Sequence, residues 1–485
     1  MNIFLSLFII FGGGILGGFV FEDKLITIYK YIALNYYICD IITTGNDVSL
    51  LEIENRKNKL MTSMTYFVVE ISFLISMIGR RIMNIFLSLF IIFGGGILGG
   101  FVFEKIKLPK LVWYIILGIL IGPSLLNIVD DTLLSISSYL RQVALVIILT
   151  RSGLSLDINN LKKSGRPAIL MCFVPACFEI VGVTIFAPLF LGISYLEALL
   201  LGSVLAAVSP AVVVPRMIKL MEEGYGKEHS VPELVMAGAS CDDIFVIVLF
   251  YSFKNLVATS TFDAWGISQI PISIVTGIIL GIGVGLLMVI IIRYLKLNKI
   301  INVIFMLGLS FGMLALEQAL KPYFSVSSLL AIIVMALVVN IFKKEEAKEI
   351  QKSYNGLWQG FEILLFALVG IATDVHYAFS KEGAIIVGLI FIALIFRSLG
   401  VFISILATEF TLKEKIFIII SYLPKATVQA SIGAIALSEG LACGTLVLTA
   451  AVVSILITAP LGAILMDLFY KKLLNKSDSI TECIS

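Results

Sequence analysis

Long apolar runs recur along most of this 485-residue chain, and they constrain its fold more than any other feature. Each run holds roughly 18 to 25 residues with few charges, the length that a helix needs to cross a lipid bilayer. Hydrophobic residues make up 59% of the chain and charged residues only 14%, a balance that fits repeated burial in lipid. The sequence therefore predicts a polytopic membrane protein.

The pattern within these runs also predicts the type of secondary structure. Runs this long and uniformly apolar lack the alternation typical of barrel strands, and lipid otherwise admits only helices. From Met83 onward the sequence predicts an all-α protein with about thirteen membrane-spanning helices. Their expected ranges are 84–102, 111–128, 138–155, 167–190, 195–216, 232–252, 270–292, 299–318, 325–342, 357–375, 384–407, 415–436 and 443–468.

The N-terminal part of the chain contains a repeat. The segment MNIFLSLFIIFGGGILGGFVFE stands at Met1–Glu22 and again, letter for letter, at Met83–Glu104. Nothing physical requires two helices to stay identical, so we interpret the repeat as a recent duplication or a sequence artefact. Residues 1–82 are treated as an extension that adds one or two helices, and residues 83–485 as the membrane domain.

Basic residues predict how the helices are oriented. Alternate loops hold 21 Lys and Arg side chains, against four in the loops between them. Basic loops stay on the cytoplasmic side, so the sequence predicts a multi-pass protein of the cytoplasmic membrane with its C-terminus inside. The net charge of +2 gives no basic excess that would favour nucleic acid. The six cysteines show no metal-ligand spacing, and no cofactor is expected.

Two neighbouring aspartates, Asp242 and Asp243, stand inside the apolar stretch MAGASCDDIFVIVLF. Two ionised, unpaired carboxylates at this depth would cost on the order of 5–7 kcal/mol. That cost is offset if the site holds a proton, or if it admits water and a cation. A site that does each in turn exchanges protons for cations, so both aspartates are candidate ligands for Na⁺ or Li⁺. The alternative is a structural hydrogen-bonded pair.

Other charged residues also lie within predicted spans. Glu179 and Arg397 have opposite charges at mid-span and predict a buried ion pair, with a structural or a transport role. Arg151 is interpreted either as a supporting polar residue or as a side chain that reaches the membrane surface. Glu362 is a further supporting candidate. His229, on an acidic loop, is interpreted as a solvated residue, with tuning of the pH response as the alternative.

Proline interrupts two of the predicted spans. Pro210 and Pro215 occur in VLAAVSPAVVVPRM, and Pro424 stands beside Lys425 in SYLPKATVQASIGAI. Proline removes a helix hydrogen bond, so both spans should be broken. If helices two to six and nine to thirteen form two inverted five-helix repeats, each broken helix is fourth in its repeat, an arrangement typical of transporters with a midplane site. Lys425 should then lie near negative helix ends, and Ser209 or freed carbonyls should complete cation coordination.

Four stretches together resemble a known family: TRSGLSLD, VSPAVVVP, GASCDDI and LPKATVQASIGAIAL. They are similar to bacterial relatives of the solute-carrier-9 subfamily B sodium/proton exchangers, in the cation:proton antiporter superfamily. The resemblance runs from Met83 to the C-terminus. Cys241 departs from it by standing where a bulky aromatic residue is expected, which bears on pocket shape and ion selectivity.

The resemblance implies an electrogenic antiporter of Na⁺ or Li⁺ against H⁺ that serves pH homeostasis. It implies a homodimer in which a six-helix core slides against a dimerisation domain, an elevator-type form of alternating access. It assigns ion binding to Asp242 and Asp243, an intramembrane salt bridge to Glu179 and Arg397, and accessory polar roles to Arg151, Glu362 and Lys425.

Several alternatives stay open from the sequence. The nearest are a K⁺/H⁺ antiporter of the same architecture and a sodium-coupled organic-anion symporter of a related fold. A transport-inactive sensor is another, since GGGILGG (Gly94–Gly100) and the glycines Gly277, Gly281 and Gly285 offer small-residue faces to a partner. An intramembrane aspartyl protease is disfavoured, because Asp242 and Asp243 lie about 100° apart on one helix and cannot face each other. The chain is not expected to be an enzyme.

Overall fold

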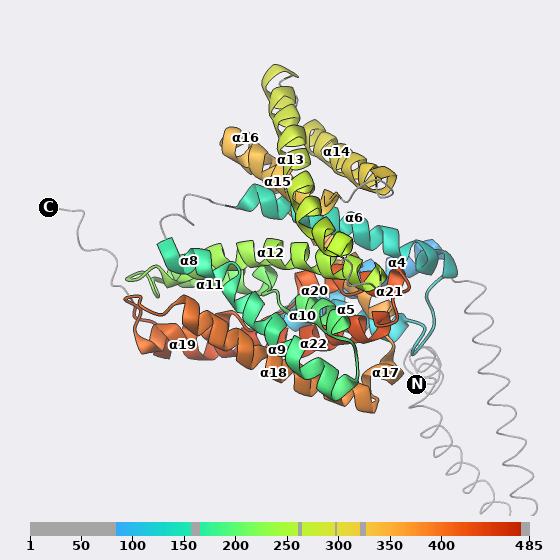
Figure 1. The fold of residues 1–485 in the computed structure, drawn as a ribbon. Helices are drawn as coiled ribbons and strands as arrows, with labels where there is room; N and C mark the ends of the chain where they lie inside the picture. The colour runs from blue at the N-terminus through green and yellow to red at the C-terminus, as the bar shows by residue number, and fades with distance from the viewer. Residues whose placement is uncertain (1–83, 157–164, 260–263, 296–297, 321–325, 477–485) are drawn as a thin grey trace, which may run out of the picture. The chain divides into compact units, whose positions relative to one another are not determined.

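The structure is a computed structural model that describes residues 84–156, 165–259, 264–295, 298–320 and 326–476 (Figure 1). The predicted extension, residues 1–82, lies outside these ranges. The helices are, in chain order, α4 (Ile85–Lys105), α5 (Lys110–Ile121), α6 (Asp131–Ser155), α8 (Gly165–Met171), α9 (Val174–Leu191), α10 (Tyr195–Leu205), α11 (Pro210–Glu223), α12 (Val231–Thr259), α13 (Ala264–Leu295), α14 (Lys299–Leu320), α15 (Ser328–Phe342), α16 (Lys344–Ile371), α17 (Val375–Ala378), α18 (Lys381–Ser404), α19 (Leu412–Ser421), α20 (Thr427–Ile432), α21 (Ile435–Ser438) and α22 (Gly444–Leu473).

Helices are the regular elements throughout the described ranges, where the only β pairing is an isolated bridge between Tyr225 and Lys476. By length and composition, ten helical segments in these ranges can cross a membrane, and three shorter apolar helices accompany them. The prediction of an all-α polytopic membrane protein is therefore confirmed. The number of crossings and the inverted repeats stay predictions.

Contacts divide the chain into two compact units. Within the described ranges, one comprises residues 84–90 and 120–135, and the other comprises the remaining described residues. In the described part of the first unit, the backbone N–H of Asp130 donates to the Ser88 hydroxyl at 3.0 Å. All candidate site residues belong to the second unit.

Small residues let helices of the second unit approach closely. A Cβ added to Gly281 on α13 would lie 2.6 Å from the backbone oxygen of Ala331 on α15, and one added to Gly400 on α18 would lie 2.8 Å from the Cα of Pro175 on α9. In lipid the hydrophobic effect does not drive helices together, so close van der Waals packing at small residues provides the attraction between them. The α13 glycines therefore pack against α15 of the same chain, so the suggestion that they face a partner is wrong.

Both spans predicted to be interrupted are broken. The first break separates α10, which ends at Leu205, from α11, which begins at Pro210, and Pro215 lies within α11 without breaking it. The second break separates α19 from α20 and contains Pro424. A proline in the first turn of a helix loses no intrahelical bond, which explains why Pro210 begins α11.

The two broken helices also begin alike. Ser194 and Glu197 form a capping box at the start of α10, and Thr411 and Glu414 form one at the start of α19. In each box the hydroxyl accepts a backbone N–H and the glutamate accepts the cap residue's N–H, so two free donors are satisfied. The helix that precedes each break therefore begins with the same local device.

Candidate functional site

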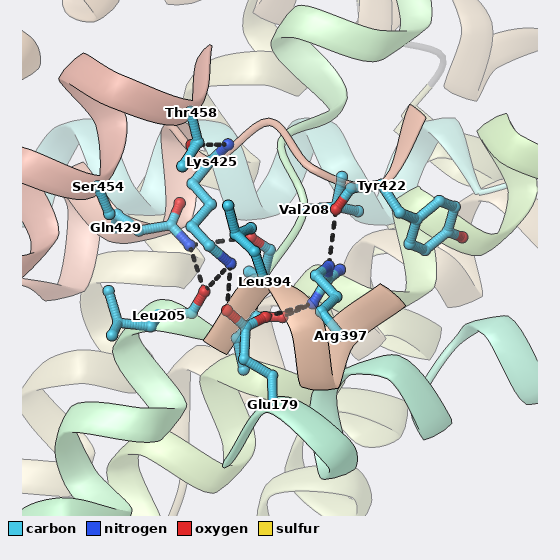
Figure 2. A network of polar contacts seen from close by, with 12 residues as sticks. Glu179, Leu205, Val208, Leu394, Arg397, Tyr422, Lys425, Gln429, Ser454 and Thr458 are labelled. Carbon is cyan, nitrogen blue, oxygen red and sulfur yellow. Dashed lines mark hydrogen bonds and ion pairs between the residues drawn. The ribbon is translucent and has the colours of Figure 1, made fainter. Parts of the chain in front are cut away.

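The two breaks contact each other. The backbone N–H of Ser209 donates to the carbonyl of Pro424 at 2.8 Å. At the end of α10, the Lys425 ammonium donates to the carbonyl of Leu205 (Figure 2). The Arg397 guanidinium donates to the carbonyl of Ala206, the next residue. The last carbonyls of a helix carry partial negative charge and lack intrahelical partners, so two cations stabilise this end. Lys425 thus occupies the position expected from the sequence.

Four buried charges form a balanced cluster. The Arg397 guanidinium lies 3.0 Å from a Glu179 carboxylate oxygen and 2.6 Å from an Asp242 oxygen. The Lys425 ammonium lies 2.6 Å from the other oxygen of Glu179. All four side chains are fully buried. Two acids and two bases balance in charge, which offsets much of the cost of burying them. The predicted Glu179–Arg397 pair is present, and its two extensions were not foreseen.

The neighbouring aspartates have different surroundings. Asp242 accepts the backbone N–H of Val208 at 2.9 Å in addition to its contact with Arg397. Asp243 is turned by about 100° along α12 and faces a cavity instead. Each aspartate keeps one carboxylate oxygen that has no hydrogen-bond partner among the described residues. Only Asp243 combines that free oxygen with a place beside open space.

The cavity has a volume of about 20 Å³ and lies between α6, α12 and α20. Its polar wall consists of Asp243, Ser152, Thr427 and Ser431, and the rest of its lining is apolar. A water molecule needs about 10–15 Å³ by this measure, so there is room for a water or a small cation. The Thr427 hydroxyl, like Asp243, finds no partner in the described part of the chain. A buried oxygen without a hydrogen-bond partner destabilises the folded protein, so the Asp243 carboxylate and the Thr427 hydroxyl both favour a water or a cation bound in the cavity.

Three other predicted residues lie outside this cavity. Ser209 is fully buried, and its hydroxyl has no partner within the described ranges. Arg151 on α6 donates from Nε to the Asn355 amide oxygen of α16 at 2.7 Å, so its guanidinium joins these two helices. Glu362 lies two turns farther along α16. The structure thus joins Arg151 to α16, the helix that also carries Glu362.

Sequence reasoning missed two residues of α20, the helix that follows the second break. Thr427 lines the cavity, and the Gln429 amide donates to the carbonyl of Ala207 at 2.9 Å and to that of Leu205 at 3.4 Å. Both stand in the quoted stretch that contains Pro424. The signal that could have found them is a polar side chain at membrane depth directly after a helix break.

His229 makes a contact that the sequence did not suggest. Its Nδ1 lies 3.0 Å from both carboxylate oxygens of Glu414, whose side chain is only 2% exposed. The ring also packs edge-on against Phe410. The hydrogen bond with Glu414 raises the pKa of His229, and the nearby carboxylates of Glu228 and Glu409 act in the same direction. His229 is therefore a partly exposed loop residue, as expected, but its ring is paired with Glu414 rather than free in solvent.

This pair predicts a pH-dependent stability. Because the pKa of His229 is raised on folding, the pair stabilises fully below the ordinary value of about 6.5 and is lost as pH rises through the raised value. We expect His229→Gln to lower the unfolding temperature by about 2 °C at pH 6 and to have little effect at pH 9. Glu414→Gln keeps the capping box, so it should give the same pH dependence in thermal unfolding in detergent. A loss of equal size at both pH values contradicts the pairing.

Two interrupted helices that touch within the membrane, with charged side chains buried around them, define a class of protein. The chain is a polytopic membrane protein of the secondary-transporter type. The family described as "Sodium/hydrogen exchanger, transmembrane" matches residues 86–469. The chain belongs to this family, and the resemblance drawn from its motifs is confirmed.

Individual proteins with similar sequences or structures support this assignment to the family. Sodium/hydrogen exchanger 9B2 of Mus musculus is 33% identical over 417 residues, which cover 82% of this chain and 75% of that protein. Sodium/hydrogen exchanger 9B1 of Homo sapiens is 32% identical over 414 residues, covering 81% and 79%. The sodium proton antiporter MjNhaP1 from Methanocaldococcus jannaschii, solved at pH 8, has a TM-score of 0.68 at 20% identity, covering 80% of this chain and 97% of that chain. This likeness establishes a shared fold.

Proposed function

We propose that the chain is an antiporter that exchanges Na⁺ or Li⁺ for H⁺ across the cytoplasmic membrane. The observation that carries the proposal is the position of Asp243. Its carboxylate lines a small cavity with one oxygen unpartnered among the described residues, while the adjacent charges of Glu179, Asp242, Arg397 and Lys425 balance one another. A single carboxylate beside a neutral cluster attracts one monovalent cation or one proton.

Binding of the two ions is competitive. Na⁺ prefers oxygen ligands, and Asp243 with the Thr427 hydroxyl supplies two of them at the cavity wall. Ser209 is a further candidate ligand once the broken helices shift. When a proton occupies Asp243, its charge is neutralised and cation binding is lost. Each ion therefore displaces the other, as exchange requires.

We propose that exchange is electrogenic, with two protons moving against one cation. The second proton is assigned to Asp242, whose contacts with Arg397 and Val208 hold it as a carboxylate in the cation-bound form. If Asp242 accepts a proton, Arg397 keeps Glu179 as a partner, so its guanidinium is still paired. One positive charge then crosses the membrane in each cycle.

The transport cycle is proposed to follow an elevator-type route in a homodimer, with inverted repeats and the C-terminus in the cytoplasm. The core would hold both broken helices and the charge cluster, while α13 to α16 would belong to the dimerisation domain. Arg151 and Glu362 would serve at the contact between α6 and α16. MjNhaP1, named as a sodium proton antiporter, supports the proposal through its shared fold.

Cation preference gives a direct test. In everted vesicles that hold a pH gradient, we expect added Na⁺ or Li⁺ to dissipate the gradient, with at least about tenfold less effect from K⁺ at equal concentration. A fluorescent pH probe reports the change. Equal or stronger dissipation by K⁺ would favour the K⁺/H⁺ alternative. Uptake of an organic anion with Na⁺, without proton movement, would favour the symporter.

A further inference from the structure

The peptide group between Ala207 and Val208 is held on both of its polar sides. Its carbonyl accepts the Gln429 amide at 2.9 Å, and its N–H donates to the Asp242 carboxylate at 2.9 Å. The peptide is planar, so its C=O and N–H turn together, and a rotation that breaks one bond breaks the other. Gln429 and Asp242 are thus coupled through one rigid group.

Gln429 is also linked to the cavity. It is fully buried on α20, two residues after Thr427 and two before Ser431, both of which line the cavity opposite Asp243. Its second hydrogen bond, to the carbonyl of Leu205, ties α20 to the last residue of α10 (Figure 2). Gln429 therefore holds α20, which carries Thr427, against the chain segment that follows α10, and the Val208 N–H of that segment donates to Asp242, the α12 neighbour of Asp243.

The same bonds decide which oxygens can hold a cation. Carbonyls freed by a helix break are potential cation ligands in transporters. Here the carbonyls of Leu205, Ala206 and Ala207 are each occupied by an N–H donor, from Lys425, Arg397 or Gln429. Of these three donors, Gln429 alone is uncharged. It therefore hydrogen-bonds to the carbonyls without placing a positive charge near the bound cation.

Resting on the function proposed above, we infer that Gln429 is a positioning residue for the cation site. It fixes the Ala207–Val208 peptide so that the N–H reaches Asp242, and it sets the Thr427 hydroxyl opposite Asp243. Removing its N–H donors should weaken cation binding while leaving the protein able to complete its cycle.

The test compares Gln429→Met, which keeps the length but not the donors, with Ser454→Ala. Ser454 is a buried hydroxyl that donates to the carbonyl of Ala451, one turn earlier on α22, at 2.7 Å. In everted vesicles we expect Gln429→Met to raise the half-saturating Na⁺ concentration about tenfold, with the maximal rate within about twofold of wild type. Ser454→Ala should match wild type in both values. Gln429→Asn, one methylene too short to bond both carbonyls, should give an intermediate rise.

Two outcomes overturn the inference. One is an unchanged half-saturating concentration in Gln429→Met, and the other is a loss of maximal rate alone, which indicates a purely structural role. If Gln429→Met fails to accumulate in the membrane, Gln429→Asn decides by the same criteria. Absence of cation-driven proton movement in wild type would instead refute the proposed function, so the two failures are distinguishable.

Discussion

Replacing Asp243 with Asn should abolish cation-driven proton movement, lowering the initial rate in everted vesicles by at least about 100-fold. The amide keeps the size of the carboxyl group, but it neither carries a negative charge for Na⁺ nor releases a proton. Because Asp243 lines a cavity rather than pairing with a base, the variant should still insert and fold. The effect should therefore appear in transport and not in protein yield.

Matched variants separate this role from a general loss of charge. Asp467→Asn removes a carboxylate that pairs with Arg216 at 3.3 Å and is 38% exposed, and it should transport like wild type. Asp242→Asn still accepts the N–H of Val208, so a slower but measurable exchange is expected. Exchange by Asp243→Asn at the rate of Asp467→Asn would refute the proposed site.

Replacing Arg397 with Met should give the largest loss of stability. The guanidinium pairs with Glu179 and Asp242 and also donates to the carbonyls of Ala206 and Tyr422, the latter at 2.8 Å. Its removal leaves the carboxylates of Glu179 and Asp242 with Lys425 as the one remaining base of the described charge cluster. Breaking a buried pair in this way costs about 3–5 kcal/mol, so thermal unfolding in detergent should move to a much lower temperature.

The control for this prediction is Arg216→Met. Arg216 makes a partly exposed pair with Asp467, and such pairs contribute about 0–1 kcal/mol. Arg397→Lys should fall between the two variants, since an ammonium lacks the planar fork that reaches several acceptors at once. If Arg397→Met proved as stable as Arg216→Met, the charge cluster would not stabilise the fold.

Much of the fold followed from the sequence because lipid leaves the backbone few choices. Uniform apolar runs dictated helices, and Pro210 and Pro424 located the two breaks through their missing N–H groups. Opposite charges at similar depth were enough to pair Glu179 with Arg397. Each of these predictions was possible because it depends on a property that one residue or one segment carries by itself.

The parts that could not be predicted depend on how helices are rotated against one another. Asp242 and Asp243 look equivalent in the sequence, yet the rotation of α12 turns one toward Arg397 and the other toward a cavity. The bonds of Gln429 require the ends of α10 and α20 to meet, and the pairing of His229 with Glu414 joins positions 185 residues apart. Hydrophobic periodicity carries no information about such contacts.

Proton release on cation binding tests the central claim most directly, namely that Asp243 holds H⁺ and a monovalent cation in turn. Purified protein in weakly buffered solution would receive Na⁺ or Li⁺ while a pH indicator reports released protons. We predict acidification by wild type and by Asp467→Asn, and none by Asp243→Asn. Equal acidification by wild type and Asp243→Asn would contradict the account.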